Sequence, residues 1–241
     1  MCGRYALTLA QGKMAELFGL PETLDIVPRY NIAPTQPVIA IWEAEARRRA
    51  HFARWGLVPG WVKDPRSFSL LINARAESMA EKPAFRDALK HGRCVVPASG
   101  YYEWHTGPDG HKQPYYITRA DGAPLAMAGL YASWMGPNGE EIDSLATITV
   151  PANGQLSGIH HRMPAILSDA AQWDAWLDVR RVSAAMAAPL ARPLADGVLA
   201  FHPVSRRVNA ARDDDPGLIE AVTPEPPQPK KPQGGGQLDL F

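Results

Sequence analysis

The chain has 241 residues, of which 46% are hydrophobic and 21% are charged, a composition typical of a folded globular protein rather than of a disordered or fibrous one. Its 25 basic and 25 acidic residues give a formal net charge of zero, so a nucleic-acid site would have to be local rather than the product of an overall basic field. Two cysteines are too few for a disulfide framework, and the chain has neither a signal-peptide pattern nor a run of about 18 apolar residues, so we expect a protein of the reducing cytoplasm without a membrane segment.

Short runs of β-branched and other apolar residues, separated by turns that contain glycine and proline, predict a chain rich in strands. In chain order these runs cover residues 37–42, 50–57, 93–97, 114–118, 125–131, 145–150 and 198–203. The runs do not alternate with the crossover helices that parallel strands require. They therefore indicate an α+β or closed-sheet protein rather than a doubly wound one.

Helical periodicity is less frequent. Thr8 could cap a helix whose buried residues end at Phe18, and Ser168 could cap a second helix whose buried residues begin at Trp173. Residues 183–190 are a third candidate. We therefore expect the α+β class, with a β-rich, barrel-like mixed sheet and peripheral helices.

The composition changes near the C-terminus. We expect one folded domain over residues 2–222. Residues 223–236 are rich first in proline and then in glycine, and they have too few apolar residues to repay the entropy lost on ordering, so they predict a disordered linker. Residues 237–241 form a terminal peptide, Gln-Leu-Asp-Leu-Phe.

Cys2 follows the initiator methionine, and a small second residue is the usual context for methionine removal. Removal would leave a free α-amine beside the thiol, and this 1,2-aminothiol could close a five-membered thiazolidine ring on the carbon of an aldehyde. The alternative is that Cys2 is a small buried residue at the start of a strand.

Three polar residues in otherwise apolar segments are candidates to surround such a nucleophile. Asn73, Glu103 and His160 could supply an orienting amide, a carboxyl acid and an imidazole base. Taken singly, each could instead be structural: an asparagine at a turn or strand edge, a solvated partner of an arginine, and a loop histidine with satisfied hydrogen bonds.

Seven segments together resemble the SOS response-associated peptidase (SRAP) family, in order and across nearly all of residues 2–209. They read MCGRYAL, RYNIAPTQ, RWGLVPGW, LINARAES, FRDALKHGRCVVPASGYYEW, IHHRMPAIL and HPVSRRVN. The resemblance implies a DNA-damage function: sensing abasic sites in single-stranded DNA, crosslinking to them through a thiazolidine at Cys2, and shielding the lesion during replication. It also implies self-removal of Met1 as a thiol autoprotease, Schiff-base chemistry like that of a lyase, and a monomer; we expect no metal and no other cofactor.

The resemblance also implies a role for each candidate residue. Cys2 would be the nucleophile, and Asn73 would hold it in place. Glu103 would act as the acid that assists ring opening and loss of the hydroxyl. His160 would shuttle protons during formation of the Schiff base and during reversal of the crosslink.

Local contacts could reconcile a neutral chain with DNA binding. Arginines near the candidate residues suit phosphate oxygens, while an aromatic ring and a proline could stack on or wedge between bases. We expect these contacts from Arg4, Asn31, Pro34, Trp61, Arg75 and Arg162. Trp61 could instead be a core or turn aromatic. So few phosphate contacts predict a shallow salt dependence of binding.

The sequence departs from the family pattern at two places. His161 stands where many relatives have an aspartate, so a titrating imidazole replaces an anion beside His160 and could change its pKa. Val62 follows Trp61 where some members have paired tryptophans, which leaves the extent of base stacking open.

The terminal peptide resembles the short peptide by which bacterial replication and repair proteins bind the DNA polymerase sliding clamp. Leu240 and Phe241 would fill an apolar pocket, Leu238 belongs to the same motif, and Gln237 would hydrogen-bond at the rim of the pocket. The resemblance implies a cytoplasmic protein held near the nucleoid and the replication fork. A tail with accidental hydrophobic residues is the alternative.

Other functions stay open at this point. A non-covalent module that binds single-stranded DNA would keep the arginines and Trp61 but tolerate loss of Cys2. A cysteine-dependent peptidase would turn over peptides without DNA. A metal hydrolase is the weakest alternative, because the histidines lack a carboxylate or cysteine ligand set at short spacing.

Overall fold

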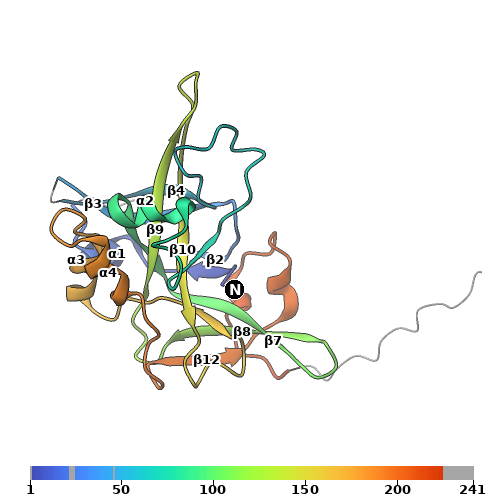
Figure 1. Ribbon diagram of the computed structural model, residues 1–241. Helices are drawn as coiled ribbons and strands as arrows, with labels where there is room; N and C mark the ends of the chain where they lie inside the picture. Colours follow the sequence, from blue (N-terminus) through green and yellow to red (C-terminus); the bar gives the residue numbers. More distant parts are fainter. Residues whose placement is uncertain (1, 22–24, 46, 225–241) are drawn as a thin grey trace, which may run out of the picture.

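The structure is a computed structural model that describes residues 2–21, 25–45 and 47–224. Its centre is a ring of five strands, in which each strand pairs with two neighbours (Figure 1). The ring runs β10 (Glu141–Pro151), β4 (Arg47–Trp55), β3 (Pro37–Ala44), β6 (Arg93–Ala98), β9 (Leu125–Met135) and back to β10. Only the β10–β4 contact in this ring is parallel. The ring is therefore a closed barrel with a mixed sheet.

Two short strands extend the barrel at β10. Strand β5 (Asn73–Arg75) pairs with it in parallel, and β11 (Arg162–Pro164) pairs with it in antiparallel orientation. The middle of β10 is buried without interruption from Ser144 to Val150. Since neighbours cover this strand on both sides along its length, its apolar run forms the centre of the hydrophobic core.

A second, antiparallel sheet lies against one end of the barrel (Figure 1). Its strand order is β12 (Leu199–Pro203), β8 (Lys112–Arg119), β7 (Gly100–Thr106), β1 (Tyr5–Leu7) and β2 (Arg29–Ile32). Strand β6 runs into β7 with one intervening residue, Ser99, and so connects the two sheets.

Gly100 makes this connection possible. A Cβ atom at this position would lie 2.4 Å from the ring of Tyr116 and 2.7 Å from the carbonyl oxygen of Ile117. Only glycine lets β7 approach β8 this closely at the point where the chain passes from the barrel into the second sheet.

The described part of the chain has four α-helices: α1 (Gln11–Phe18), α2 (Pro83–His91), α3 (Ala170–Leu177) and α4 (Ala184–Ala187). Helix α3 packs on β6 and helix α2 packs on β9. In Figure 1, α1, α3 and α4 lie together on one side of the barrel. No helix in the described part of the chain has the length and apolarity needed to span a bilayer.

The expected α+β class, with a barrel-like mixed sheet and peripheral helices, is confirmed. Each of the seven predicted strands is present, with ends that differ by a few residues. The strands that were not predicted are β1, β2, β5, β7 and β11. These unpredicted strands are short or carry polar residues, so sheet pairing rather than local sequence holds them in place.

Two expected helix caps were wrong. Thr8 does not cap α1; its hydroxyl bonds to Ser99, and the N-cap position is Ala10. Asp169, not Ser168, caps α3 by accepting from the backbone N–H of Gln172. The third candidate is confirmed, since α4 and a 3₁₀ turn together fill residues 184–190.

The helix α2 was not predicted from the sequence. It begins with Pro83 at its first turn, where a missing N–H costs nothing, and it buries Phe85, Ala88 and Leu89. The domain limits 2–222 stay a prediction, as do the linker and the terminal peptide, because residues 225–241 lie outside the described part of the chain.

Arg93 ties the helices to the barrel. Its guanidinium is buried and donates to the carbonyl oxygens of Leu89, Trp176, Asp178 and Val182 at 2.5 to 3.0 Å. These carbonyls belong to the last turn of α2, to the end of α3 and to the turn after it. One side chain on β6 thus satisfies acceptors that would otherwise be buried without partners.

Replacement of Arg93 should therefore make the protein easier to unfold. We expect Arg93→Met to lower the free energy of unfolding by about 3 kcal/mol or more, because several buried carbonyls lose their donors at once. Urea unfolding followed by tryptophan fluorescence measures the loss. The exposed Arg180→Met is the control and should change stability by less than about 0.5 kcal/mol. Equal losses in the two variants would contradict this role of Arg93.

Candidate active site

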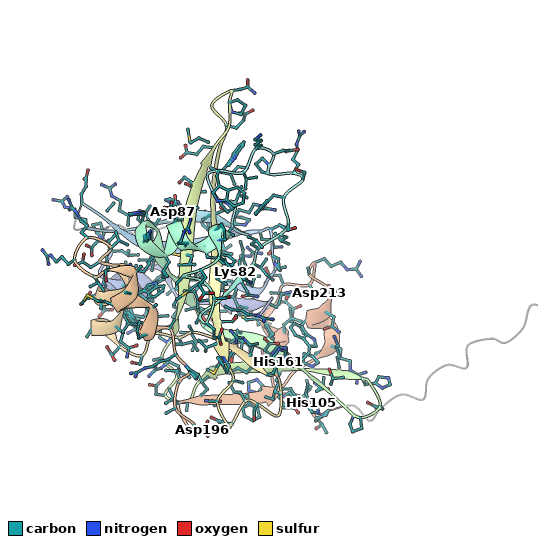
Figure 2. All side chains as sticks on the ribbon, viewed as in Figure 1. Lys82, Asp87, His105, His161, Asp196 and Asp213 are labelled. Atoms are coloured by element: carbon teal, nitrogen blue, oxygen red, sulfur yellow. The ribbon has the colours of Figure 1, made fainter. Side chains whose placement is uncertain are left out.

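The four candidate residues come from four different segments at the junction of the two sheets. Cys2 precedes β1, which pairs with β7, the strand that carries Glu103. Asn73 opens β5, and His160 lies in the loop before β11; both of these strands pair with β10. His105 on β7 approaches this loop, with its Nδ1 atom 2.7 Å from the carbonyl oxygen of Gly158. Figure 2 labels His161 in this loop and His105 on β7.

Cys2 is completely buried. The alternative interpretation, in which Cys2 is a small structural residue at the start of a strand, also predicts this burial. The side-chain amide nitrogen of Asn73 donates to the carbonyl oxygen of Cys2 at 2.9 Å. Burial, together with the negative charge of the nearby Glu103 carboxyl, raises the pKa of the Cys2 thiol well above its usual value. The thiol is therefore neutral at rest, and the hydrogen bond from Asn73 holds the backbone of Cys2 in place.

Glu103 is a buried carboxyl, with only 3% of its surface exposed. Burial raises its pKa to about 7. Its Oε1 atom lies 3.8 Å from Nδ1 of His160. A carboxyl that is close to half protonated at neutral pH can both donate and accept a proton.

The imidazole of His160 is oriented by the backbone of its own loop. Its Nδ1 atom accepts from the N–H of Arg162 at 3.0 Å. Burial lowers the pKa of His160, and the neighbouring His161, whose ring centroid is 4.3 Å away, contributes in the same direction. The imidazole is therefore a neutral base at pH 7, consistent with the expectation that His161 affects its pKa.

The sequence matches the family "SOS response associated peptidase (SRAP)" over residues 1–211. The chain belongs to the SRAP family. It is 34% identical over 224 residues to the abasic site processing protein YoqW of Bacillus subtilis, covering 92% of this chain and all of the relative. It is 33% identical to the abasic site processing protein HMCES of Xenopus tropicalis, covering 92% of this chain and 78% of the relative.

The fold is also present among solved structures. A crystal structure of a protein from Bacteroides thetaiotaomicron superimposes with a TM-score of 0.82 at 26% identity, covering 92% of this chain and all of that one. That protein therefore shares the fold that holds the candidate site.

Two of the residues expected to contact DNA make hydrogen bonds within this SRAP domain. The guanidinium of Arg4 donates to Oδ1 of Asn31 and to the carbonyl oxygen of Val208, both at 2.7 Å. Asn31 is completely buried and donates to the carbonyl oxygens of Ala210 and Asp213. These bonds attach residues 208–213 to β2 and to the chain before β1. Arg4 and Asn31 therefore have a structural role, in addition to any contact that they make with DNA.

Arg162 is also paired. It is largely buried and makes a bidentate ion pair with Glu77 at 2.6 and 3.0 Å, and it donates to the carbonyl oxygen of Thr149 at 2.5 Å. This pair lowers the pKa of Glu77. A phosphate would have to compete with the Glu77 carboxylate for this guanidinium.

The other three expected DNA contacts are accessible. Trp61 lies in a turn with 58% of its surface exposed, and its ring meets Phe68 edge to face at 5.7 Å. Arg75 is exposed and Pro34 is half-buried. Trp61 is thus a turn aromatic rather than a core one, and its exposed ring is available for stacking.

Sequence reasoning did not single out Glu77 or the buried hydroxyls of the site. Thr147 on β10 donates to Oδ1 of Asn73 at 2.7 Å. The hydroxyls of Tyr5 and Tyr101, which pair across β1 and β7, are buried with no hydrogen-bond partner among the described residues. The signal available in the sequence was the presence of threonines and a serine within the apolar run of β10, since buried hydroxyls need hydrogen-bond partners.

No cluster of metal-ligating side chains occurs among the residues that the structure describes.

The raised pKa of Glu103 predicts a pH-dependent effect of Glu103→Gln on stability. The folded protein holds this proton more tightly than the unfolded chain, so the stability contribution of Glu103 falls as pH rises from the ordinary value of 4.5 toward 7. We expect the free energy of unfolding of Glu103→Gln, relative to wild type, to increase by about 2 kcal/mol between about pH 5 and about pH 8.

Urea unfolding at the two pH values measures this increase. Glu140→Gln is the control, because Glu140 is exposed and hydrogen bonds from Asn138 lower its carboxyl pKa. Its relative stability should change little and in the opposite direction. A difference between Glu103→Gln and wild type that does not vary with pH would contradict the raised pKa.

Proposed function

We propose that this protein processes abasic sites in single-stranded DNA by forming a covalent thiazolidine crosslink through Cys2. The observation that carries the proposal is the buried Glu103 carboxyl with a pKa of about 7, beside a neutral His160 and close enough to Cys2 to raise its thiol pKa. The names of its relatives, which are abasic site processing proteins, support the same substrate.

The proposed reaction begins after removal of Met1, which the protein carries out itself. The α-amine of Cys2 attacks the aldehyde carbon of the ring-opened deoxyribose and forms a carbinolamine. The carbinolamine hydroxyl takes a proton from Glu103 and leaves as water. The nitrogen then returns its own proton to the Glu103 carboxylate, which gives a neutral Schiff base. The thiol then adds to the carbon of this C=N bond while its proton passes to the nitrogen, so the finished thiazolidine has lost one water overall.

The protonation states fit these steps. A neutral thiol carries the proton that the imine nitrogen needs, and a carboxyl with a pKa near 7 can give a proton in one step and regain it in another. His160 carries protons between Glu103 and the sugar. The hydrogen bond from Asn73 holds the Cys2 backbone while its amine and thiol react in turn.

The proposed DNA contacts fall into two groups. Trp61, Pro34 and Arg75 meet the strand directly, because their side chains are at least partly accessible. The guanidiniums of Arg4 and Arg162 contact phosphate only by sharing or exchanging their present acceptors. The protein acts as a monomer that shields the lesion from strand cleavage.

Intact-mass spectrometry tests the crosslink. The purified protein should lack Met1 and, after incubation with an oligonucleotide that contains one abasic site, should gain the oligonucleotide mass minus one water. Cys2→Ala should form no adduct. Cys94→Ala removes the other buried cysteine, lies outside the site, and should crosslink like wild type. Retention of Met1, or an adduct in Cys2→Ala, would refute the thiazolidine mechanism.

We also propose that residues 237–241 recruit the protein to the bacterial sliding clamp and so to the replication fork in the cytoplasm. This part rests on the sequence, because the peptide lies outside the described residues. A flexible linker with the length of residues 223–236 spans about 20 Å root-mean-square. Such a tether would raise the local concentration of the domain near replicating DNA without a new DNA contact.

Binding to purified clamp tests this recruitment. We expect the full chain to bind with a dissociation constant in the micromolar range, and the double change Leu240→Ala and Phe241→Ala to abolish binding because the apolar anchors are lost. Gln228→Ala in the linker is the control and should bind like wild type. Fluorescence anisotropy measures all three proteins, and equal affinities would remove the recruitment role while leaving the crosslinking proposal intact.

A further inference from the structure

We propose that Thr147 is a positioning residue of the active site. Its hydroxyl helps to fix the orientation of the Asn73 side-chain amide, and this amide holds Cys2 in place. The inference rests on the proposed function, since Cys2 is the residue proposed to react. It assigns a role to a side chain in the middle of β10 that is completely buried.

A chain of two hydrogen bonds joins Thr147 to Cys2. Thr147 and Asn73 are paired in register where β10 and β5 run parallel. The hydroxyl of Thr147 donates to Oδ1 of Asn73 at 2.7 Å, and Nδ2 of Asn73 donates to the carbonyl oxygen of Cys2 at 2.9 Å. The amide of Asn73 therefore lies between a hydroxyl and a backbone carbonyl, and both of its ends are used.

The alternative acceptor for the Thr147 hydroxyl is already occupied. The carbonyl oxygen of Ile72 lies 3.3 Å from this hydroxyl, but it accepts the indole N–H of Trp55 and the backbone N–H of Thr147, each at 3.0 Å. A carbonyl oxygen has two lone pairs, and these two donors use them. The hydroxyl proton is thus directed to Asn73, the shorter of the two contacts.

This proton and the carbonyl oxygen of Cys2 together fix the orientation of the amide. The oxygen and nitrogen of an asparagine side chain have nearly the same size and shape, so packing does not distinguish them. If the amide were turned over, its oxygen would face the carbonyl oxygen of Cys2, and two acceptors would repel each other. Removal of the hydroxyl leaves Oδ1 without its donor and weakens the preference for the orientation that holds Cys2.

Thr149, two residues along the same strand, has different partners. Its hydroxyl lies 3.2 Å from the guanidinium of Arg162 and 3.5 Å from the carbonyl oxygen of Ala74. The two threonines on this face of β10 therefore serve different side chains. Only Thr147 is bonded to the residue that contacts Cys2.

Single-turnover crosslinking to an abasic-site oligonucleotide, over a range of protein concentrations, tests the consequence. Thr147→Val keeps the shape of the side chain but removes the hydroxyl, and we expect its limiting rate to fall roughly fivefold to tenfold, as for the loss of one buried hydrogen bond. The concentration for half-maximal rate should change less than about twofold, because Thr147 does not contact DNA.

Two variants separate positioning from packing and stability. Thr147→Ser retains the hydroxyl and should restore the limiting rate to within about twofold of wild type. Ser144→Ala also removes a buried hydroxyl from β10, one that donates to Ala132 and accepts from Val58, and should crosslink like wild type. The proposal is overturned if Thr147→Val reacts like wild type, if Thr147→Ser is as slow as Thr147→Val, or if Ser144→Ala loses the same factor.

A second readout does not depend on crosslinking. In ¹⁵N-labelled protein, the side-chain amide signal of Asn73, assigned by its disappearance in Asn73→Asp, should be protected from hydrogen exchange in wild type and in Thr147→Ser. In Thr147→Val it should shift and exchange faster. If wild type forms no crosslink, the proposed function fails, and the positioning role of Thr147 is then tested by this amide signal alone. A signal that is the same in all three proteins overturns that role.

Discussion

The site depends on one strand, β10, which pairs with four others. It closes the barrel by contacting β4 and β9, and it holds β5 and β11, which bring Asn73 and the His160 loop into position. Its interior residues are buried, so it cannot shift register without moving the core. The pairing of β10 therefore both closes the barrel and positions Asn73 and the His160 loop.

Burial gives the site its chemistry. The same apolar surroundings raise the pKa values of the Cys2 thiol and the Glu103 carboxyl and lower the pKa of His160. All three groups are thereby shifted toward their neutral forms, which avoids the cost of an unpaired charge in the interior. Neutral groups that exchange protons among themselves suit the proposed reaction between an amine, a thiol and an aldehyde, in which no permanent charge is created.

The strands that were predicted from the sequence are those with the longer apolar runs. The apolar runs of β6, β9 and β10 are long enough to be recognised, whereas β1, β5 and β11 have three residues each and exist only through pairing with distant strands. The chemistry of the site could be proposed from residue types and family resemblance. The contacts could not, because Glu77 and Arg162 are 85 residues apart, and the bond from Thr147 depends on a register that only the folded sheet defines.

Arg93 also constrains how the chain can vary in evolution. Its planar guanidinium reaches carbonyls from three segments at once, a set that the single ammonium of a lysine cannot reproduce. An insertion or deletion in the turn that contains Asp178 and Val182 would leave acceptors unpaired, so length changes there should be selected against. The turns of the β7–β8 and β9–β10 hairpins project away from the barrel (Figure 1), and the hydrogen bonds found in these turns join residues of the same hairpin. New segments are therefore more easily accepted in these two hairpins than behind β6.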